Sequence, residues 1–274
     1  MTSIPRLTPA RIWQLSYDLH ERDLAVVTLL VNLRVASVRQ LERACFPGQP
    51  RTARRVLSEL AQRRIVVRLQ RTIGGVRAGS AGHVYALDVV GQHLAGLGGP
   101  AHGSRLRSPW TPGARFLDHA LAVTETYVQL LEQERRGAFE LNEFQAEPEC
   151  WRTFNHLGAP MILKPDAFVR LGFAGYEDSY FIEVDRGTES PRTLTGKAKT
   201  FQHYYLNGRE QDERGVFPRV LWLVPDAKRE VELQAALHIA EVEHLSATAI
   251  SDRLIEAVLN GQETTSNKKG GDDE

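Results

Sequence analysis

Two short apolar runs carry acidic residues at positions where a buried strand should have none. Residues 167–171 come directly after Asp166, and residues 180–184 contain Glu183 and end just before Asp185. Apolar runs of this length and composition predict two neighbouring strands. Because a charge in a core strand is costly unless it is paired or binds a metal, we expect these three acids to converge at one edge of a sheet. Such a group would form a hard oxygen site for a divalent cation.

A helix predicted over residues 191–207 would bring the opposite charge to these acids. Lys197, Phe201 and Tyr204 fall at positions i, i+4 and i+7, on one helical face. That face carries the bulky side chains and should pack on the sheet, so Lys197 is better placed than Lys199 to point toward the acids. The alternative interpretation is a lysine whose stem packs while its ammonium group reaches water.

The net charge of zero hides an asymmetry between the two parts of the chain. Residues 1–110 hold sixteen Arg, no Lys and six acidic residues, a net charge of +10. Residues 111–274 hold eighteen basic and twenty-eight acidic residues, a net charge of −10. Two domains can differ in charge without a functional reason. A gap of this size nevertheless favours a first half that contacts nucleic acid and a second half that binds metal.

Three helices followed by a hairpin are predicted in the basic half. The helices are expected over residues 23–33, 38–46 and 51–64, and the two strands over residues 66–73 and 83–87. Ser37 is a good N-cap for the second helix, and the loop of the hairpin is rich in glycine. This order of elements resembles a winged helix-turn-helix.

The third of these helices carries the strongest DNA-binding signal. One of its faces is an apolar core stripe, and the opposite face holds arginines and small polar groups suited to phosphates and base edges in a major groove. The candidate DNA-binding residues of this helix are Arg51, Arg54, Arg55, Ser58 and Gln62. In the hairpin, Arg71 and Arg77 would lie near the DNA backbone or the minor groove. A solvated helix surface is the alternative interpretation, and the hairpin that follows favours DNA binding.

The acidic half is predicted to continue the alternation of helices and strands. The expected elements are a long helix over residues 115–134, strands over 139–144 and 217–224, a hairpin or loop over 151–160, and helices over 230–240 and 247–259. The two acid-bearing strands are expected to be separated by residues 172–179. Beyond residue 260 the chain is polar, and we expect it to be disordered.

Length and composition limit the class of protein. A chain of 274 residues suggests about two domains. It has no run of about 18 apolar residues and no apolar signal core at its N-terminus, so no membrane association is expected. With Cys45 and Cys150 as its only cysteines, neither a disulfide framework nor a zinc cluster is expected, and a cytoplasmic location is the default.

The acid-bearing strands and the following helix resemble the PD-(D/E)XK nuclease superfamily. Pro165-Asp166 matches the PD element, and Glu183-Val184-Asp185 matches the (D/E)XK element except that Asp185 stands where lysine is expected. Some members carry that lysine on the next helix, a part that Lys197 or Lys199 would play. The predicted order of helix, three strands, helix and strand is the order of the superfamily core.

A longer set of residues resembles the replication-relaxation family of bacterial plasmid and mobile-element proteins. It comprises the string Glu183-Val-Asp-Arg-Gly-Thr-Glu189, Lys197, the aromatic cluster Phe201, Tyr204 and Tyr205, and the upstream string His119-Ala-Leu-Ala-Val-Thr-Glu125. With the winged helix, this resemblance covers most of the chain. Because the first helix of the nuclease superfamily often lends a carboxylate to the site, Glu125 becomes a further candidate.

Together the resemblances imply an α+β/α/β chain, with an N-terminal winged helix-turn-helix followed by a restriction-endonuclease-like αβββαβ domain. The expected boundaries are residues 1–95 for the DNA-binding domain, 96–113 for a linker, 114–260 for the nuclease-like domain and 261–274 for a disordered tail.

The implied function is a DNA-binding protein of plasmid or mobile-element replication or transfer, whose nuclease-like domain acts on DNA phosphodiesters with Mg²⁺ or Mn²⁺. Its implied catalytic residues are Asp166, Glu183, Asp185, Lys197 and Glu125, and the first three of these would hold the metal. The expected partners are double-stranded DNA and other replication or conjugation proteins, with a homodimer left open.

Two other functions compete with this one. The first is a non-catalytic DNA-binding accessory protein or transcriptional regulator with a degenerate nuclease fold, which Asp185 in place of the expected lysine favours. The second is a metal-free interaction protein whose acids form surface ion pairs.

Overall fold

The computed structural model describes residues 8–69, 82–98 and 113–266. By its internal contacts the chain divides into two units, Met1–Val128 and Gln129–Glu274. The sequence predicts a boundary over residues 96–113, whereas this division falls inside the long helix α6 (Ala114–Arg135). The predicted wing residues Arg71 and Arg77 lie outside the described residues.

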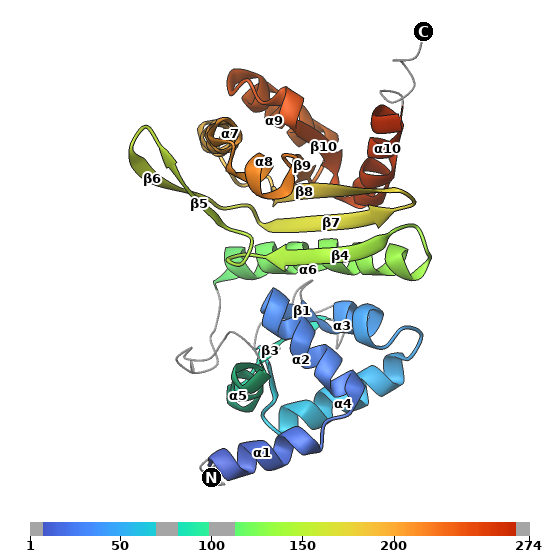
Figure 1. Cartoon of the computed structure of the whole chain (residues 1–274). Helices are drawn as coiled ribbons and strands as arrows, with labels where there is room; N and C mark the ends of the chain where they lie inside the picture. The colour runs from blue at the N-terminus through green and yellow to red at the C-terminus, as the bar shows by residue number, and fades with distance from the viewer. Residues whose placement is uncertain (1–7, 70–81, 99–112, 267–274) are drawn as a thin grey trace. The chain divides into compact units, whose positions relative to one another are not determined.

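The first unit combines helices with a small antiparallel sheet (Figure 1). Its helices are α1 (Pro9–Tyr17), α2 (Glu21–Leu33), α3 (Val38–Cys45), α4 (Pro50–Gln62) and α5 (Val89–Gly98), followed by the first part of α6. Its strands are β1 (Val35–Ser37), β2 (Val66–Arg68) and β3 (Val84–Leu87), in the order β1-β3-β2. The three predicted helices and the strand pairing are confirmed, while β1 was not predicted because three residues give no periodicity.

Local sequence signals set the helix starts of this unit. Ser37 caps α3 as predicted, because its Oγ accepts a hydrogen bond from the Gln40 backbone N–H at 3.3 Å while the Gln40 side chain accepts one from the Ser37 N–H at 2.9 Å. Pro50 occupies the first turn of α4, where its missing N–H costs nothing. The apolar stripe of α4 is buried, including Ala53 and Leu57.

The beginning of α6 is attached to the first unit by hydrogen bonds as well as by apolar packing. The buried Gln40 side chain donates to the Leu121 carbonyl at 2.8 Å, and the Thr124 hydroxyl donates to the Val35 carbonyl at 2.8 Å. Leu117 and Leu121 pack with residues of β1 and β3 in one apolar cluster. These contacts explain why α6 up to Val128 belongs to the first unit.

The second unit is a mixed α/β structure built on a mixed five-stranded sheet. Its strands are β4 (Glu140–Ala146), β7 (Ala167–Phe173), β8 (Tyr176–Val184), β9 (Arg219–Val224) and β10 (Ser246–Ile250), in the order β10-β9-β8-β7-β4. The β4-β7-β8 part is antiparallel and the β8-β9-β10 part is parallel. Strand β8 is central, which accounts for its run of buried residues from Tyr180 to Val184.

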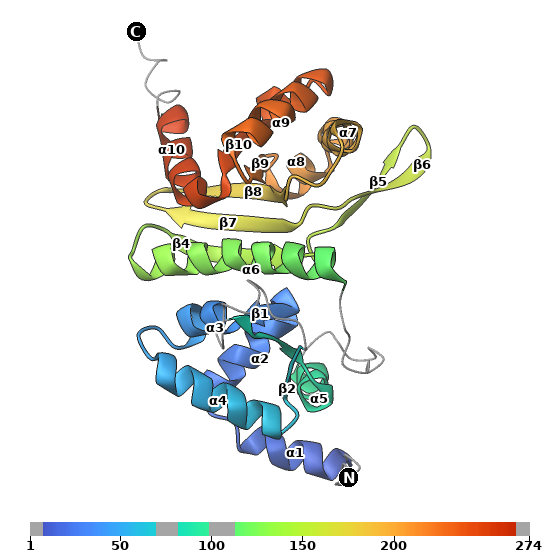
Figure 2. The same ribbon diagram turned by 180° about the vertical axis from the view of Figure 1, so that it is seen from behind.

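A separate hairpin and several helices complete this unit. The hairpin consists of β5 (Arg152–His156) and β6 (Ala159–Leu163), and the helices are α7 (Pro191–Asn207), α8 (Arg209–Arg214), α9 (Ala227–Ile239), η2 (Glu243–Leu245), η3 (Ser251–Arg253) and α10 (Leu254–Ser266). Helices α7, α8 and α9 lie on one side of the sheet in both views (Figures 1 and 2). No helix in the described part of the chain is long and apolar enough to cross a membrane.

Aromatic side chains join the sheet to α7. Phe181 of β8 lies 5.9 Å from Phe201 and 6.3 Å from Tyr204, measured between ring centroids. Phe201 also lies 5.8 Å from Trp222 of β9, again measured between ring centroids. This layer confirms the prediction that the face of α7 bearing Phe201 and Tyr204 packs on the sheet.

Two sequence predictions in the second unit are wrong and one needs its boundary moved. Residues 247–250 form part of β10 rather than a helix, because they pair in parallel with the exposed edge of β9. Strands β7 and β8 extend into the predicted connection of residues 172–179, so that only Ala174 and Gly175 separate them. Helix α10 continues to Ser266, beyond the predicted start of the tail, and residues 267–274 lie outside the described residues.

We expect Phe181→Ala to lower the free energy of unfolding by about 3–5 kcal/mol, because it removes a fully buried ring from the layer between β8 and α7. The matched control is Leu206→Ala on α7, where the side chain is 66% exposed and the change should stay within about 0.5 kcal/mol. Urea unfolding followed by circular dichroism measures both. Equal effects of the two substitutions would contradict this assignment of the core.

Candidate functional site

Asp166 and Glu183 face each other across two antiparallel strands. The register that pairs Ala167 with Ile182 continues to these acids, and the Asp166 N–H donates to the Ile182 carbonyl at 3.0 Å. Residues directly opposite each other in a sheet share a face. Both side chains are buried, with 7% of Asp166 and 3% of Glu183 exposed. The predicted convergence of these two acids is therefore present in the fold.

Lys197 supplies the opposite charge. Its Nζ donates to Oε2 of Glu183 at 3.1 Å and lies 2.9 Å from Oε1 of Glu189. Lys199, two positions along α7, is exposed. The helical spacing therefore correctly predicted that Lys197, and not Lys199, points toward the acids. The reason is that residues 197, 201 and 204 share the face of α7 that packs on the sheet.

Asp166 is also tied to the backbone of the neighbouring strand. Its Oδ2 accepts a hydrogen bond of 2.7 Å from the Val184 N–H. In addition, the Cys150 thiol donates to the carbonyl of the preceding Pro165 at 2.9 Å. These bonds fix the start of β7, so the Asp166 carboxylate is held in place before any ligand arrives.

The electrostatics of the cluster favour an added cation. Burial, followed by the charge of Asp166, raises the pKa of Glu183 well above its usual range, and Lys197 only partly opposes this. Burial lowers the pKa of Lys197, but the charges of Glu183, Asp166 and Glu189 outweigh it, so the lysine stays protonated at neutral pH. One ammonium group thus stands among three carboxylates, so burial and the excess negative charge together keep the pKa of Glu183 raised.

Asp185 does not join this cluster. It pairs with the buried guanidinium of Arg229 on α9 and accepts a hydrogen bond from the Gly187 N–H at 2.9 Å. Strand β8 ends at Val184, and Gly187 turns the chain with a φ of 71°, so strict strand alternation no longer directs the side chain. The expected set of three converging acids is therefore found as two acids beside Lys197, with the third held by Arg229.

The donor set fits a divalent metal held by two carboxylates. Mg²⁺ and Mn²⁺ take oxygen ligands, and Mg²⁺ in particular is often bound by one or two carboxylates together with water and substrate phosphate. Asp166 and Glu183 provide such a buried pair where β7 begins and β8 ends. The described residues contain no group of three or more His, Cys, Asp or Glu side chains arranged to hold a metal ion.

The remaining predicted site residues lie in the first unit. Glu125 of α6 lies 2.5 Å from Arg43 and accepts a hydrogen bond from Gln40 at 3.1 Å, so its catalytic role stays a prediction. On α4, Arg51, Ser58 and Gln62 are exposed as expected. Two further candidates on that helix are exposed but paired: Arg54 lies 3.4 Å from Glu42, and Arg55 lies 2.7 Å from Glu59.

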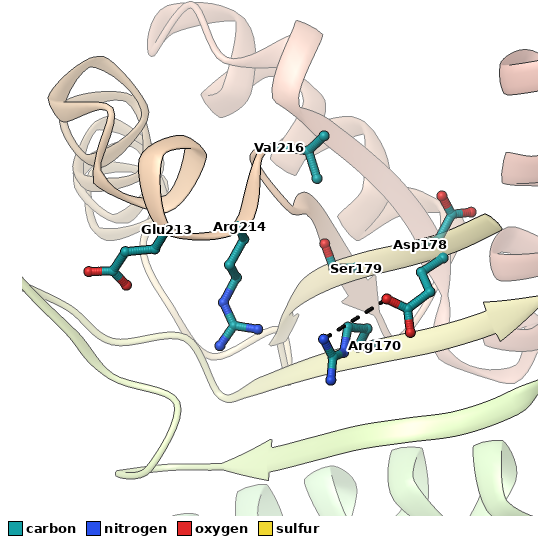
Figure 3. A pocket seen from close by; sticks show the side chains of 7 residues that line it. Arg170, Asp178, Ser179, Glu213, Arg214 and Val216 are labelled. Atoms are coloured by element: carbon teal, nitrogen blue, oxygen red, sulfur yellow. Dashed lines mark ion pairs between the residues drawn. The ribbon is translucent and has the colours of Figure 1, made fainter.

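A pocket of about 470 Å³ opens farther along the same sheet (Figure 3). Its lining residues are Arg170, Glu177, Asp178, Ser179, Glu213, Arg214 and Val216. Arg170 lies 3.9 Å from Glu177. The lining holds three acids and two arginines, and Asp166, Glu183 and Lys197 do not line it. Its mixed charge makes it a weaker candidate than the acid cluster.

Sequence reasoning missed two residues that organise the cluster. Glu189, present in the family-like string, shares Lys197 with Glu183. Arg229 holds Asp185 and also donates to the Glu189 carbonyl at 2.7 Å. Arg229 lies 44 positions after its partner within an ordinary helical segment, so no local pattern could have assigned it.

Comparisons with known proteins add a family match. The family model described as replication-relaxation matches residues 27–220. No curated protein matches the chain. Among solved structures, the restriction endonuclease FokI bound to DNA is similar at 10% identity with a TM-score of 0.27, over 94% of this chain and 47% of that chain. The present chain thus spans about half the length of that endonuclease.

We expect the free energy of unfolding of Glu183→Gln, measured relative to that of wild type, to increase as the pH rises from about 5 to 8. A raised pKa means that the folded state holds the Glu183 proton more tightly than the unfolded state, so wild type loses stability as the pH rises above the ordinary value of 4.5. Glutamine carries no such proton. Urea unfolding at several pH values measures the difference, and a gain that shrank with pH would contradict the assigned direction.

Proposed function

The chain belongs to the replication-relaxation family, and we propose on this premise that it acts on DNA in the replication or transfer of a plasmid or mobile element. In this proposal the first unit is a winged helix-turn-helix that binds DNA, called the reader below, and the second unit holds a metal-dependent nuclease-like site. The single observation that carries it is the cluster of Asp166, Glu183 and Lys197, in which two buried carboxylates face each other beside a lysine.

The first unit supports the reader part of this proposal. Its order of helices α2, α3 and α4 followed by paired strands β2 and β3 is the order expected of a winged helix. Helix α4 presents Arg51, Arg55 and Ser58 on its exposed face and buries its apolar stripe. Arginines would contact phosphates or guanine edges, and the hydroxyl would contact bases or phosphates. The excess of positive charge over residues 1–110 adds long-range attraction to DNA.

The second unit supports the chemical part. A divalent cation, when bound by Asp166 and Glu183, would lower the pKa of a water molecule and neutralise charge on the phosphate under attack. Asp166 is held in position by the Val184 N–H, so its carboxylate loses little freedom on binding. Lys197 would release Glu183 or Glu189 to a cation and turn its ammonium group toward the phosphate, where it stabilises negative charge.

A non-catalytic accessory protein is the second candidate, and one observation favours it. Asp185 stands where the nuclease superfamily has lysine, and Arg229 holds it away from the other two acids. Lys197 is already paired with Glu183 and Glu189, so the cluster also serves as a structural ion pair. In that case DNA binding by the first unit would be the whole activity.

The nuclease proposal predicts that wild-type protein nicks or linearises supercoiled plasmid with Mg²⁺ or Mn²⁺. Asp166→Asn and Glu183→Gln should each lower the rate by about 10²-fold or more, because each removes a ligand charge. The matched control is Asp178→Asn, which changes another acid of β8, the strand that carries Glu183. Asp178 lies outside the cluster, so this substitution should leave the cleavage rate unchanged. Gel electrophoresis over time measures the rate.

Two outcomes decide between the candidates. Cleavage lost in both cluster variants and kept in the control supports the nuclease. Absence of cleavage by wild type, together with tight and salt-sensitive DNA binding, overturns the nuclease and supports the accessory protein.

The reader proposal predicts that Arg51→Ala with Arg55→Ala weakens binding to a duplex and lowers the slope of log affinity against log salt by about 2, since each phosphate contact contributes about 0.9. Stability should change little, because the Arg55–Glu59 pair is exposed. The control variant, Arg11→Ala with Arg22→Ala, removes the same charge from α1 and α2. Fluorescence anisotropy at several salt concentrations measures binding, and an equal loss in both variants would count against a reader on α4.

A further inference from the structure

Two adjacent segments of the second unit contain no acidic residue. One is residues 151–165, which include the β5–β6 hairpin, and the other is α7. Together they carry five basic residues, namely Arg152, Lys164, Arg192, Lys197 and Lys199. Arg152 and Lys197 are paired with acids of other segments, and Lys164, Arg192 and Lys199 are exposed. The chain from residue 111 onward has a net charge of −10, so these segments are a local exception within an acidic region.

The hairpin and α7 are joined by direct contacts and lie side by side in both views (Figures 1 and 2). The rings of His156 and His203 stack with their centroids 3.9 Å apart. Near the end of α7, the Asn207 side chain donates to the Asn155 carbonyl at 3.1 Å. The next helix adds a bond of 2.8 Å from Arg209 to the Thr153 carbonyl. The two segments therefore present one continuous surface.

One stripe of α7 concentrates the basic groups on this surface. Arg192, Gly196, Lys199 and His203 stand at i, i+4, i+7 and i+11, which aligns them along one helical face. Arg192 and Lys199 are exposed, and neither forms a salt bridge with any of the described residues. The charge of Lys199 contributes, after burial and His156, to a lowered pKa of His203, which is consistent with Lys199 lying close to the histidine pair.

Gly196 is an unexpected residue at the centre of this stripe. Glycine in a helix interior weakens the helix relative to any ordinary residue. A Cβ atom added here would meet nothing within 4 Å, so internal packing does not require glycine at this position. Glycine also occurs where a ligand must approach the backbone closely. Its place between Arg192 and Lys199 points to a partner that lies directly against the helix.

We propose that the stripe of α7 and the adjoining β5–β6 hairpin form a second DNA-binding surface, which holds the phosphate backbone of a duplex. The inference rests on the proposed action on DNA and adds a contact that the reader helix α4 does not supply. From Arg192 to His203 the stripe extends about 16 Å at 1.5 Å per residue. That is about half of the roughly 34 Å turn of a DNA helix, which suits a run of backbone phosphates better than a single small anion.

The same helix links this surface to the acid cluster. Lys197 of α7 reaches Glu183 from another face of the helix, while Arg192 and Lys199 remain exposed. A duplex held along the stripe would bring a phosphodiester near the cluster. The surface would therefore position the substrate, while Asp166 and Glu183 act on it.

The test compares two charge-reversal variants of the full chain in binding to a fluorescein-labelled 30-base-pair duplex of mixed sequence. Arg192→Glu with Lys199→Glu reverses the stripe, and Arg136→Glu with Arg253→Glu makes the same charge change at two exposed positions outside the hairpin and α7. We expect the stripe variant to bind about tenfold more weakly at 50 mM salt and to lower the salt slope by about 2. The control variant should retain wild-type slope and lose less than about threefold.

The outcomes separate the failure of this inference from the failure of the proposed function. If wild type binds DNA in a salt-sensitive way and the two reversal variants have equal affinity, the second surface is overturned. DNA binding by the reader helix α4 is then not contradicted. Absence of DNA binding by wild type overturns both. Matching circular dichroism spectra and melting temperatures of the variants exclude unfolding as the cause of a loss.

Gly196→Gln provides an independent measurement without a change of charge. Because nothing lies within 4 Å of an added Cβ, the substitution should raise the melting temperature through better helix propensity. If a DNA backbone lies against the helix here, the same substitution should weaken duplex binding about fivefold or more. A stabilised variant with unchanged DNA affinity overturns the close approach, and with it the proposed surface.

Discussion

Burial of the Glu183 carboxylate on the central strand of a five-stranded sheet is the constraint on which the second unit depends. An isolated charge in such a place costs several kcal/mol, so it must be compensated by a partner or by a bound cation. Lys197 provides part of this compensation, and its position requires α7 to cross the sheet at one particular place. The facing carboxylate of Asp166 adds negative charge, which leaves the cluster suited to binding a further cation.

The same helix satisfies a second buried acid. Glu210 of α8 is fully buried and accepts a hydrogen bond from the Tyr204 hydroxyl at 2.5 Å. Arg214 and Arg152 approach it to 3.1 and 3.5 Å. Because Arg152 belongs to β5, this network ties the hairpin to α7 and α8. The hairpin therefore has a fixed place beside α7 rather than depending on its own two strands, which alone would be only marginally stable.

The distribution of charge follows the division of tasks that we propose. Arginines are concentrated in residues 1–110, where α4 presents several of them to solvent. The second half is acidic overall, yet its hairpin and α7 carry basic groups and no acids. An acidic surface repels DNA, so a nuclease-like site in such a unit needs a local basic path to its substrate. The stripe on α7 would supply that path.

The sequence by itself determined the local elements and the central pair of acids. Periodicity located α2, α3, α4 and α7, and the helical spacing of Lys197, Phe201 and Tyr204 identified which lysine turns toward the sheet, because these signals depend only on residues close in the chain. An apolar run directly after Asp166 and a second run that contains Glu183 indicated two neighbouring strands, because an acid at a position expected to be buried is visible in the sequence itself.

Only the tertiary structure decided the features that depend on distant partners. Residues 247–250 became a strand because the edge of β9 was available for pairing. Asp185 turned away from the other two acids because Arg229 of α9 binds it, and Glu125 is engaged by Arg43, which lies 82 positions earlier. The surface that the stripe of α7 shares with the hairpin formed only when the two were brought together by the His156–His203 stack and by bonds between segments about 50 residues apart. Such pairings are set by the packing of the whole unit, and no local sequence pattern records them.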